Sequence, residues 1–307
     1  MTRRVLRTLL PAAALVWTAA VGPAAAAVPL PIDAPLCGPA ELERLDGLQA
    51  DLDAKAAAGE AGRAQYWYVD PRACRLSVAV LRGAEDAHTE GFVGAALAAS
   101  ALPAPTSLTE VDEPVDRRIA RVPAPAQRGA RAAGTLHGGS AIYSGTSGLV
   151  YECTSGLNNY RPGTTTTAGH CADAATTWYD ARGNRIGAVT DWRYPGTDWA
   201  VITPVAGWSL PNDVLGSTVP VARFGKASLG EAVCGRGATS GTRCGSVTAV
   251  NVTVNYPDGL VKGLVRSSQS GGEGDSGGPV YDGGTGLGLI SGGASSGSPT
   301  FFQPLTF

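Results

Sequence analysis

A serine that could act as a nucleophile lies in residues 274–279, whose sequence is Gly-Asp-Ser-Gly-Gly-Pro. A serine attacks only when a base takes its proton and hydrogen-bond donors stabilise the oxyanion that forms. Because glycine lacks a Cβ and reaches backbone angles closed to other residues, the N–H groups of Gly274 and Ser276 can point at one spot. Alone, such a stretch is typical of an ordinary turn, so the chemistry depends on partners elsewhere in the chain.

The candidate base is His170, which lies far upstream in the sequence Thr-Ala-Gly-His-Cys and is one of only three histidines. A carboxylate must orient such a base, and two acids compete for this role. Asp198 opens the apolar run 199–202, where burial would strengthen its hydrogen bond to a histidine. Asp191 lies among aromatic and basic residues that are typical of a solvated turn. We therefore prefer Asp198 and keep Asp191 as the alternative.

The region that must position these residues, from Leu136 onward, predicts β-structure. Short runs rich in β-branched and aromatic residues alternate there with Gly, Asn, Asp and Pro, a pattern typical of strands joined by turns. About a dozen such strands in roughly 170 residues indicate a closed or doubled antiparallel barrel. The runs include residues 149–151, 177–179, 186–189, 199–202, 247–255, 260–265 and 287–290.

The preceding region, residues 28–135, predicts a small α+β unit. Leucines at helical spacing and alternating apolar residues indicate two helices and a hairpin. Its end, residues 117–135, mixes Arg with Pro and Ala without an apolar period, so we expect an exposed linker that is open to proteolysis. The expected helices cover residues 41–58 and 89–100, and the expected strands cover residues 65–69 and 75–81.

Residues 1–27 predict a signal peptide. Basic residues at positions 3, 4 and 7 precede an apolar run too short to span a bilayer comfortably, and small residues follow at 24–27. Both a general secretory signal and a twin-arginine signal fit this pattern, so the export route stays open. We expect a secreted, extracellular protein with no membrane association after the signal is removed.

Six cysteines behind such a signal predict three disulfides, in any of fifteen pairings. Their spacing includes no Cys-x-x-Cys pair, so no metal site is expected, and no motif calls for a cofactor. The formal net charge of -2 gives no electrostatic case for binding nucleic acid.

The order His170, Asp198, Ser276 is the order of the chymotrypsin triad. Residues 136–307 resemble the chymotrypsin-like secreted serine proteases of actinobacteria, the streptogrisin and α-lytic protease group. Residues 28–135 resemble the prosegment of that group, chiefly at 66–81. The matching segments are Gly138 to Tyr143, Thr167 to Cys171, Thr197 to Ala200, Cys234 to Gly245, Gly274 to Pro279, Ser291 to Gly293 and Phe301 to Pro304.

The resemblance implies a double antiparallel β-barrel, an all-β domain with the active site between its barrels, preceded by the α+β prosegment. His170 would be the general base, with Asp198 as its orienter. Ser276 would be the nucleophile of an acyl-enzyme mechanism, and the N–H groups of Gly274 and Ser276 would form the oxyanion hole. The resemblance therefore implies a serine endopeptidase that uses no metal or cofactor.

The resemblance also implies how substrate binds. Ser291, Gly292 and Gly293 would form the edge strand that pairs with extended substrate backbone, which suits protein or peptide substrates. The two glycines leave room for a large side chain, and no Asp lies near Ser270 at the expected pocket base. We therefore expect apolar residues before the cut.

The same resemblance implies separate roles for the prosegment and the protease domain. The prosegment, residues 28–135, would help the protease domain, residues 136–307, to fold and would then block its crevice. The folding role is expected because barrels dominated by non-local contacts fold slowly. We expect the mature protease to be a monomer.

The family's disulfides match two cysteine pairs of this chain. The two remaining cysteines both lie in the prosegment, and we predict that they pair with each other. The expected bridges are Cys153–Cys171, Cys234–Cys244 and Cys37–Cys74.

The chain departs from the family at two places. Ser270 and Ser296 stand where many streptogrisins carry a further disulfide beside the specificity pocket, so we expect looser pocket walls. Asp275 is the acid that needs a cationic partner when it is buried. Arg236 lies one position from the slot that supplies this partner in the bacterial group, and we expect it to pair with Asp275.

Two other functions compete with the protease. A non-catalytic secreted binding module on a protease-like scaffold would be expected to have lost one of His170, Asp198 and Ser276, and all are present. An esterase would place its Gly-x-Ser-x-Gly turn before a helix, whereas no helix-like segment follows Pro279.

Overall fold

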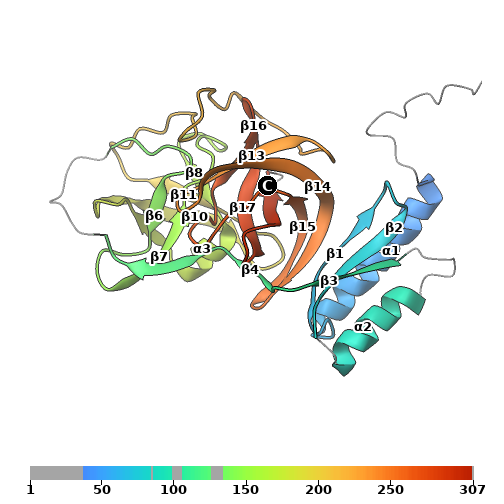
Figure 1. The fold of residues 1–307 in the computed structure, drawn as a ribbon. Helices are drawn as coiled ribbons and strands as arrows, with labels where there is room; N and C mark the ends of the chain where they lie inside the picture. Colours follow the sequence, from blue (N-terminus) through green and yellow to red (C-terminus); the bar gives the residue numbers. More distant parts are fainter. Residues whose placement is uncertain (1–36, 84–85, 99–105, 126–133, 306–307) are drawn as a thin grey trace, which may run out of the picture. The chain divides into compact units, whose positions relative to one another are not determined.

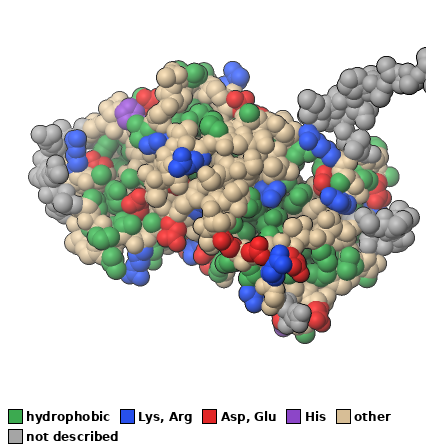
Figure 2. Space-filling model, viewed as in Figure 1, with side chains coloured by type: hydrophobic (Ala, Val, Ile, Leu, Met, Phe, Trp, Pro, Cys, Tyr) green, Lys and Arg blue, Asp and Glu red, His purple; other side chains and the backbone are tan. Residues whose placement is uncertain are grey.

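The computed structural model describes residues 37–83, 86–98, 106–125 and 134–305. The predicted signal peptide, residues 1–27, lies outside these ranges. Among the helices of the described ranges, none is long and apolar enough to cross a membrane. Figure 2 shows charged side chains of both signs scattered among uncharged ones on the face that it draws.

The N-terminal part of the described chain is the predicted α+β unit. Its two helices lie on one face of a three-stranded sheet (Figure 1), and their apolar sides meet the sheet in a core that includes Leu45, Trp67 and Phe92. A proline opens the first helix, as suits a first turn whose N–H groups have no helical partner. The elements are α1 (Pro39–Ala57), β1 (Ala64–Asp70), β2 (Arg75–Leu81), α2 (Ala87–Ala98) and β3 (Thr106–Val111).

The first barrel is a seven-stranded sheet in the order β5-β7-β6-β9-β10-β11-β8. Its core includes the fully buried side chains of Ile142, Trp178, Ile186 and Ile202. The elements are β5 (Ala120–Pro123), β6 (Ala141–Tyr143), β7 (Leu149–Thr154), β8 (Thr165–Thr167), the short helix α3 (Gly169–Ala174), β9 (Thr177–Tyr179), β10 (Arg185–Arg193) and β11 (Trp199–Pro204).

The second barrel closes because β14 pairs with both β15 and β13, which joins β13, β16, β17, β18, β15 and β14 in a ring. Its core includes Val233, Val265, Val280 and Phe302. The double antiparallel barrel predicted from the sequence is thus confirmed. The strands are β12 (Arg223–Phe224), β13 (Ala232–Gly237), β14 (Gly241–Tyr256), β15 (Gly259–Ser267), β16 (Pro279–Asp282), β17 (Thr285–Ala294) and β18 (Thr300–Pro304).

The α+β unit adds its sheet to the second barrel. β1 pairs antiparallel with β14, with Tyr66 opposite Val254 and Trp67 opposite Thr253. The Tyr66 ring lies 5.1 Å from the Phe301 ring, centroid to centroid, in a buried apolar cluster that both parts share. We call this contact the β1–β14 platform.

The structure differs from the exposed linker expected over residues 117–135. β4 (Val115–Arg117) pairs with β17, β5 pairs with β7, and the side chain of Arg118 between them is buried. These short strands are held by backbone hydrogen bonds, so their side chains show no apolar period that the sequence could reveal. The rest of the expected linker, residues 126–133, lies outside the described residues.

Candidate active site

The three candidate catalytic residues come from both barrels and meet. His170 lies in α3, just after β8, and Asp198 immediately precedes β11, so the first barrel supplies both. Ser276 lies in the loop before β16 of the second barrel. His170 Nδ1 is 2.9 Å from Asp198 Oδ2, and His170 Nε2 is 2.7 Å from Ser276 Oγ. None of the three side chains is exposed to solvent.

Asp198 is held as a carboxylate by a set of donors. It accepts hydrogen bonds from the backbone N–H of His170 at 2.9 Å and from the hydroxyl of Ser291 at 2.5 Å, besides the imidazole. Burial is the largest single influence and raises the pKa of Asp198, but the charge and hydrogen bonds of His170 and the Ser291 hydroxyl together hold that pKa below its ordinary value. The competing acid, Asp191, instead binds Arg161 at the surface.

Two residues that the sequence did not single out complete this network. The Ser291 hydroxyl gives its only proton to Asp198, so the Tyr256 hydroxyl, 3.0 Å away, must donate to Ser291 Oγ. Burial raises the pKa of Tyr256, which keeps that proton in place. The Gln303 side chain accepts the backbone N–H of Asp198 at 2.8 Å. The family motif around residue 303 was visible in the sequence, but the role of its amide was not.

The candidate oxyanion hole contains a carbonyl oxygen of the same chain. Gly274 has φ of +92°, a conformation that side chains rarely adopt. This turn aims the N–H groups of Gly274 and Ser276 at the carbonyl oxygen of Arg118, at 2.5 and 3.3 Å. Two donors on one carbonyl oxygen are the arrangement that stabilises charge developing on it.

The predicted substrate strand also carries a segment of the same chain. β4 pairs antiparallel with β17, with Arg117 opposite Gly292 and Asp116 opposite Gly293. The N–H of Arg118 points to the carbonyl oxygen of Ser291 at 3.4 Å. Residues 115–118 therefore fill the crevice in the extended form that edge-strand pairing gives to a bound peptide.

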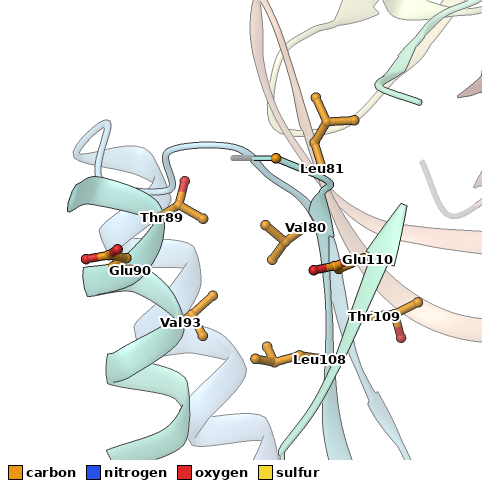
Figure 3. Close-up of a pocket in the computed structure, with 9 residues that line it drawn as sticks. Val80, Leu81, Thr89, Glu90, Val93, Leu108, Thr109 and Glu110 are labelled. Carbon is orange, nitrogen blue, oxygen red and sulfur yellow. The ribbon is translucent and has the colours of Figure 1, made fainter. Parts of the chain in front are cut away.

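A separate hollow lies in the α+β unit. A cavity of about 280 Å³ lies between α2 and strands β2 and β3, lined by Val80, Val93 and Leu108 among others (Figure 3). It contains none of the candidate catalytic residues. A smaller hollow, lined by Arg118, Gly271 and Gly293 among others, lies beside the segment that occupies the crevice.

The expected ion pair between Arg236 and Asp275 is absent from the ion pairs of the described residues, and that expectation is wrong. The Asp275 carboxylate instead accepts backbone N–H bonds from Gly272 at 2.8 Å and from Thr239 and Ser240 at 3.1 and 3.0 Å. Backbone donors satisfy a buried carboxylate without a neighbouring cation, which removes the reason for the expected pair.

The structure joins the six cysteines in three disulfides. Cys153–Cys171 ties α3, which carries the candidate base, to β7. Cys234–Cys244 links β13 and β14, and Cys37–Cys74 lies within the α+β unit. Beside the pocket, where the sequence has serines at 270 and 296, the walls are joined by a backbone hydrogen bond from Gly271 N–H to Gly297 O at 2.9 Å.

The arrangement has the parts that acyl transfer requires: a hydroxyl on an oriented imidazole, and donors around a carbonyl oxygen. Within the described ranges, no group of His, Cys, Asp and Glu is placed to hold a metal ion. The site residues proposed from the sequence therefore lie together as one constellation, and Arg118, Tyr256 and Gln303 join it.

Comparisons with known proteins bear on both parts of the chain. The family model described as the alpha-lytic protease prodomain matches residues 42–99. Streptogrisin-C of Streptomyces griseus is 32% identical over 274 residues, covering 86% of this chain and 54% of that protein. The chain thus spans about half the length of this relative.

Two further similarities concern the barrels. Serine protease 2 of Streptomyces fradiae is 36% identical over 170 residues, which cover 52% of this chain and 96% of that protein. A solved glutamic acid-specific serine protease is 33% identical, with a TM-score of 0.51, over 56% of this chain and 94% of that one.

Proposed function

Because the chain belongs to the streptogrisin and α-lytic protease group of chymotrypsin-like serine proteases, we propose that it is a secreted serine endopeptidase made with an N-terminal prosegment. One observation carries this proposal. A peptide carbonyl oxygen accepts the N–H groups of Gly274 and Ser276, while the Ser276 hydroxyl lies 2.7 Å from His170 Nε2.

In the proposed reaction His170 Nε2 takes the proton of Ser276 as Oγ attacks the carbonyl carbon. The N–H groups of Gly274 and Ser276 stabilise the oxyanion, an effect worth on the order of 3 kcal/mol for one donor. Asp198 holds the imidazole tautomer with the proton on Nδ1 and stabilises the imidazolium. His170 then protonates the leaving amine, and water releases the acyl group from Ser276 by the reverse sequence.

The prosegment is proposed to act as a folding aid and an inhibitor. The β1–β14 platform supports the first role, because β1 and its hairpin partner β2 are close in sequence and give β14 of the second barrel a strand to pair with. Occupation of the crevice by residues 115–118 supports the second role. The boundary at 135/136, export from the cell and the monomeric state stay predictions.

The sequence alone predicts an apolar preference before the cut. The side chain that lies in the pocket of this structure is an arginine, so this occupant argues for a different preference. The substrates proposed are proteins or peptides, since backbone pairing with β17 needs no particular side chain.

A fluorophosphonate probe, which reacts only with an activated serine, tests the proposed function. The processed, secreted protein should be labelled on the peptide that contains Ser276. A His170→Ala variant, secreted and folded by the same criteria, should remain unlabelled. Folded, processed protein that carries no label on Ser276 would favour the non-catalytic binding module.

A further inference from the structure

The residue before the cut is identified by the carbonyl that lies in the oxyanion hole. In this structure it is Arg118, whose carbonyl oxygen accepts the N–H groups of Gly274 and Ser276. Its N–H faces Ser291 O, and β4 continues upstream along β17. The peptide bond held for attack is therefore the one between Arg118 and Ile119.

The Arg118 side chain enters a pocket whose shape fits its guanidinium group. Only 3% of the residue is exposed, and Nη2 donates to Gly297 O at 2.7 Å and to Pro299 O at 3.4 Å. The walls are glycines: a Cβ added to Gly271 would collide with Nη1, and one added to Gly293 would collide with Nη2. The pocket thus has room for a planar guanidinium and offers it two carbonyl acceptors on one side.

A carboxylate lies on the other side of this group. The position of a Cβ on Gly271 is 3.1 Å from Asp275 Oδ2, so Gly271 separates the guanidinium from that carboxylate. Burial lowers the pKa of Arg118 to about 10, and the charge of Asp275 opposes this effect. The guanidinium therefore enters the pocket protonated at neutral pH, with a negative charge behind it.

An apolar side chain would use this pocket less well. It would give the carbonyls of Gly297 and Pro299 no guanidinium donor. A lysine would bring a single point charge on a flexible stem, whereas the planar guanidinium donates to both carbonyls through Nη2 and places Nη1 beside Gly271.

From this geometry, and resting on the proposed serine endopeptidase function, we propose that the pocket selects arginine before the cut and that the chain matures by cleaving its own Arg118–Ile119 bond. The sequence-based expectation of an apolar preference is replaced by this proposal. The pocket base near Ser270 supplies no carboxylate, and Asp275 takes that electrostatic role across Gly271.

The cleavage is an ordinary acyl transfer. Ser276 Oγ bonds to the carbonyl carbon of Arg118, and its proton moves to His170. The bond from this carbon to the Ile119 nitrogen breaks, and His170 returns the proton to the new Ile119 amine. Water then hydrolyses the Arg118 ester, which restores the Ser276 hydroxyl and leaves a carboxylate on Arg118.

The first experiment follows the maturing full chain by mass spectrometry, recording the C-terminus of the released prosegment. This end is read because a later cut at the 135/136 boundary that the sequence predicts would remove Ile119 from the protease. We expect a prosegment that ends at Arg118, and Arg118→Leu should slow its release by about tenfold or more, the scale of lost hydrogen bonds to a charged group. Arg121→Leu, which changes an exposed arginine of the same segment, is the matched control.

Two outcomes of this experiment would overturn the proposal. One is a prosegment end elsewhere throughout the time course, and the other is equal release from the Arg118→Leu and Arg121→Leu chains. Ser276→Ala separates self-cleavage from cleavage by host proteases: release after Arg118 in that variant would remove the self-cleavage claim.

The second experiment tests whether the pocket prefers arginine, or whether Arg118 lies there only because it belongs to the same chain. The secreted protease is given peptides that differ only in Arg, Lys, Leu or Phe before the cut. We expect kcat/KM to fall in the order Arg, Lys, then Leu and Phe, with Arg above Leu by about tenfold or more. Gly271→Ala, whose Cβ intrudes on Nη1, should lower the ratio of Arg to Leu.

The results also separate this proposal from the proposed function. Hydrolysis of Leu or Phe peptides faster than Arg peptides would refute arginine selection and leave the serine endopeptidase intact. Hydrolysis of none of the peptides, together with no fluorophosphonate label on Ser276, would remove the proposed function itself.

Discussion

The prosegment meets the catalytic barrels in two places that hold it by different means. On the β1–β14 platform, large buried side chains such as Tyr66 and Phe301 face each other, and the Gln49 amide donates to Asn251 O at 2.7 Å. In the crevice, β4 lies against the glycines of β17. Backbone hydrogen bonds and the buried side chain of Arg118 hold it there. Both contacts include antiparallel strand pairing, but the platform adds large buried side chains, whereas the crevice pairs β4 with glycines.

This difference separates two roles. The platform involves no bond that the reaction changes, so it holds the prosegment in the same way before and after a cut. The crevice contact includes the carbonyl carbon that the serine would attack, so a cut alters it directly. Variants that weaken one contact should therefore leave the other contact intact, so that its effect on the prosegment can be measured.

The largest expected effect comes from Ser276→Ala. Loss of the nucleophile should lower kcat by on the order of 10⁶-fold, while both contacts of the prosegment stay intact. The secreted chain should therefore remain uncut, as intact mass would show. Ser209→Ala, at an exposed serine of the loop after β11, should process normally. Wild-type kcat on a peptide substrate in purified, folded Ser276→Ala would contradict the assignment of the nucleophile.

Asp198→Asn should lower kcat by on the order of 10⁴-fold, the scale for losing the carboxylate that sets the imidazole tautomer. The pKa of Asp198 is below its ordinary value of 3.8 in the folded protein. Its stabilising contribution is therefore complete above pH 3.8 and is lost as the pH falls through the lower folded-state pKa.

Thermal unfolding at several pH values tests whether the folded state favours the Asp198 carboxylate. In a Ser276→Ala background that prevents self-digestion, Asp198→Asn should lower Tm most at neutral pH, and the difference should shrink below pH 3.8. Asp191→Asn, at the exposed pair with Arg161, should produce a much smaller change. A Tm difference that grows as the pH falls would show that the folded state does not favour the carboxylate.

Tyr66→Ala weakens the platform and leaves the crevice contact unchanged. Truncating a buried aromatic residue costs about 3 kcal/mol, so the cut prosegment should inhibit the secreted protease about 100-fold less tightly. The yield of folded protease should also fall. Leu108→Ala, at an exposed leucine of the prosegment, is the control. Unchanged inhibition by the Tyr66→Ala prosegment would mean that the crevice contact alone holds it.

Loss of the Ser291 or the Tyr256 hydroxyl should have the smallest effects. The first variant is Ser291→Ala. It removes the hydroxyl between Tyr256 and Asp198 but keeps the backbone that pairs with substrate, so kcat should fall by about tenfold with little change in KM. Tyr256→Phe removes a hydroxyl that is one hydrogen bond further from Asp198, so it should reduce kcat less than Ser291→Ala does. A change confined to KM would place Ser291 in binding instead of in positioning Asp198.

The residues that carry the chemistry were predictable from sequence because short motifs surround them. His170, Asp198 and Ser276 each lie in a stretch whose composition indicates its role. The helix over residues 41–58 was predictable from its leucine spacing, and α1 covers Pro39–Ala57.

Other features depend on contacts that no local pattern records. β4 and the buried Arg118 are held by backbone pairing with a strand far along the chain, so the segment resembles a linker in sequence. The Tyr256–Ser291 contact joins two strands 35 residues apart. The Arg236 expectation failed because three backbone N–H groups already satisfy Asp275.

Rapid mixing of the processed protease with a chromogenic ester tests the central claim, acyl transfer through Ser276, most directly. The account predicts a burst of one product molecule per enzyme molecule, followed by slower turnover, with the trapped acyl group on the Ser276 peptide. Folded, processed enzyme that shows no burst, or that carries the acyl group on another residue, would contradict it.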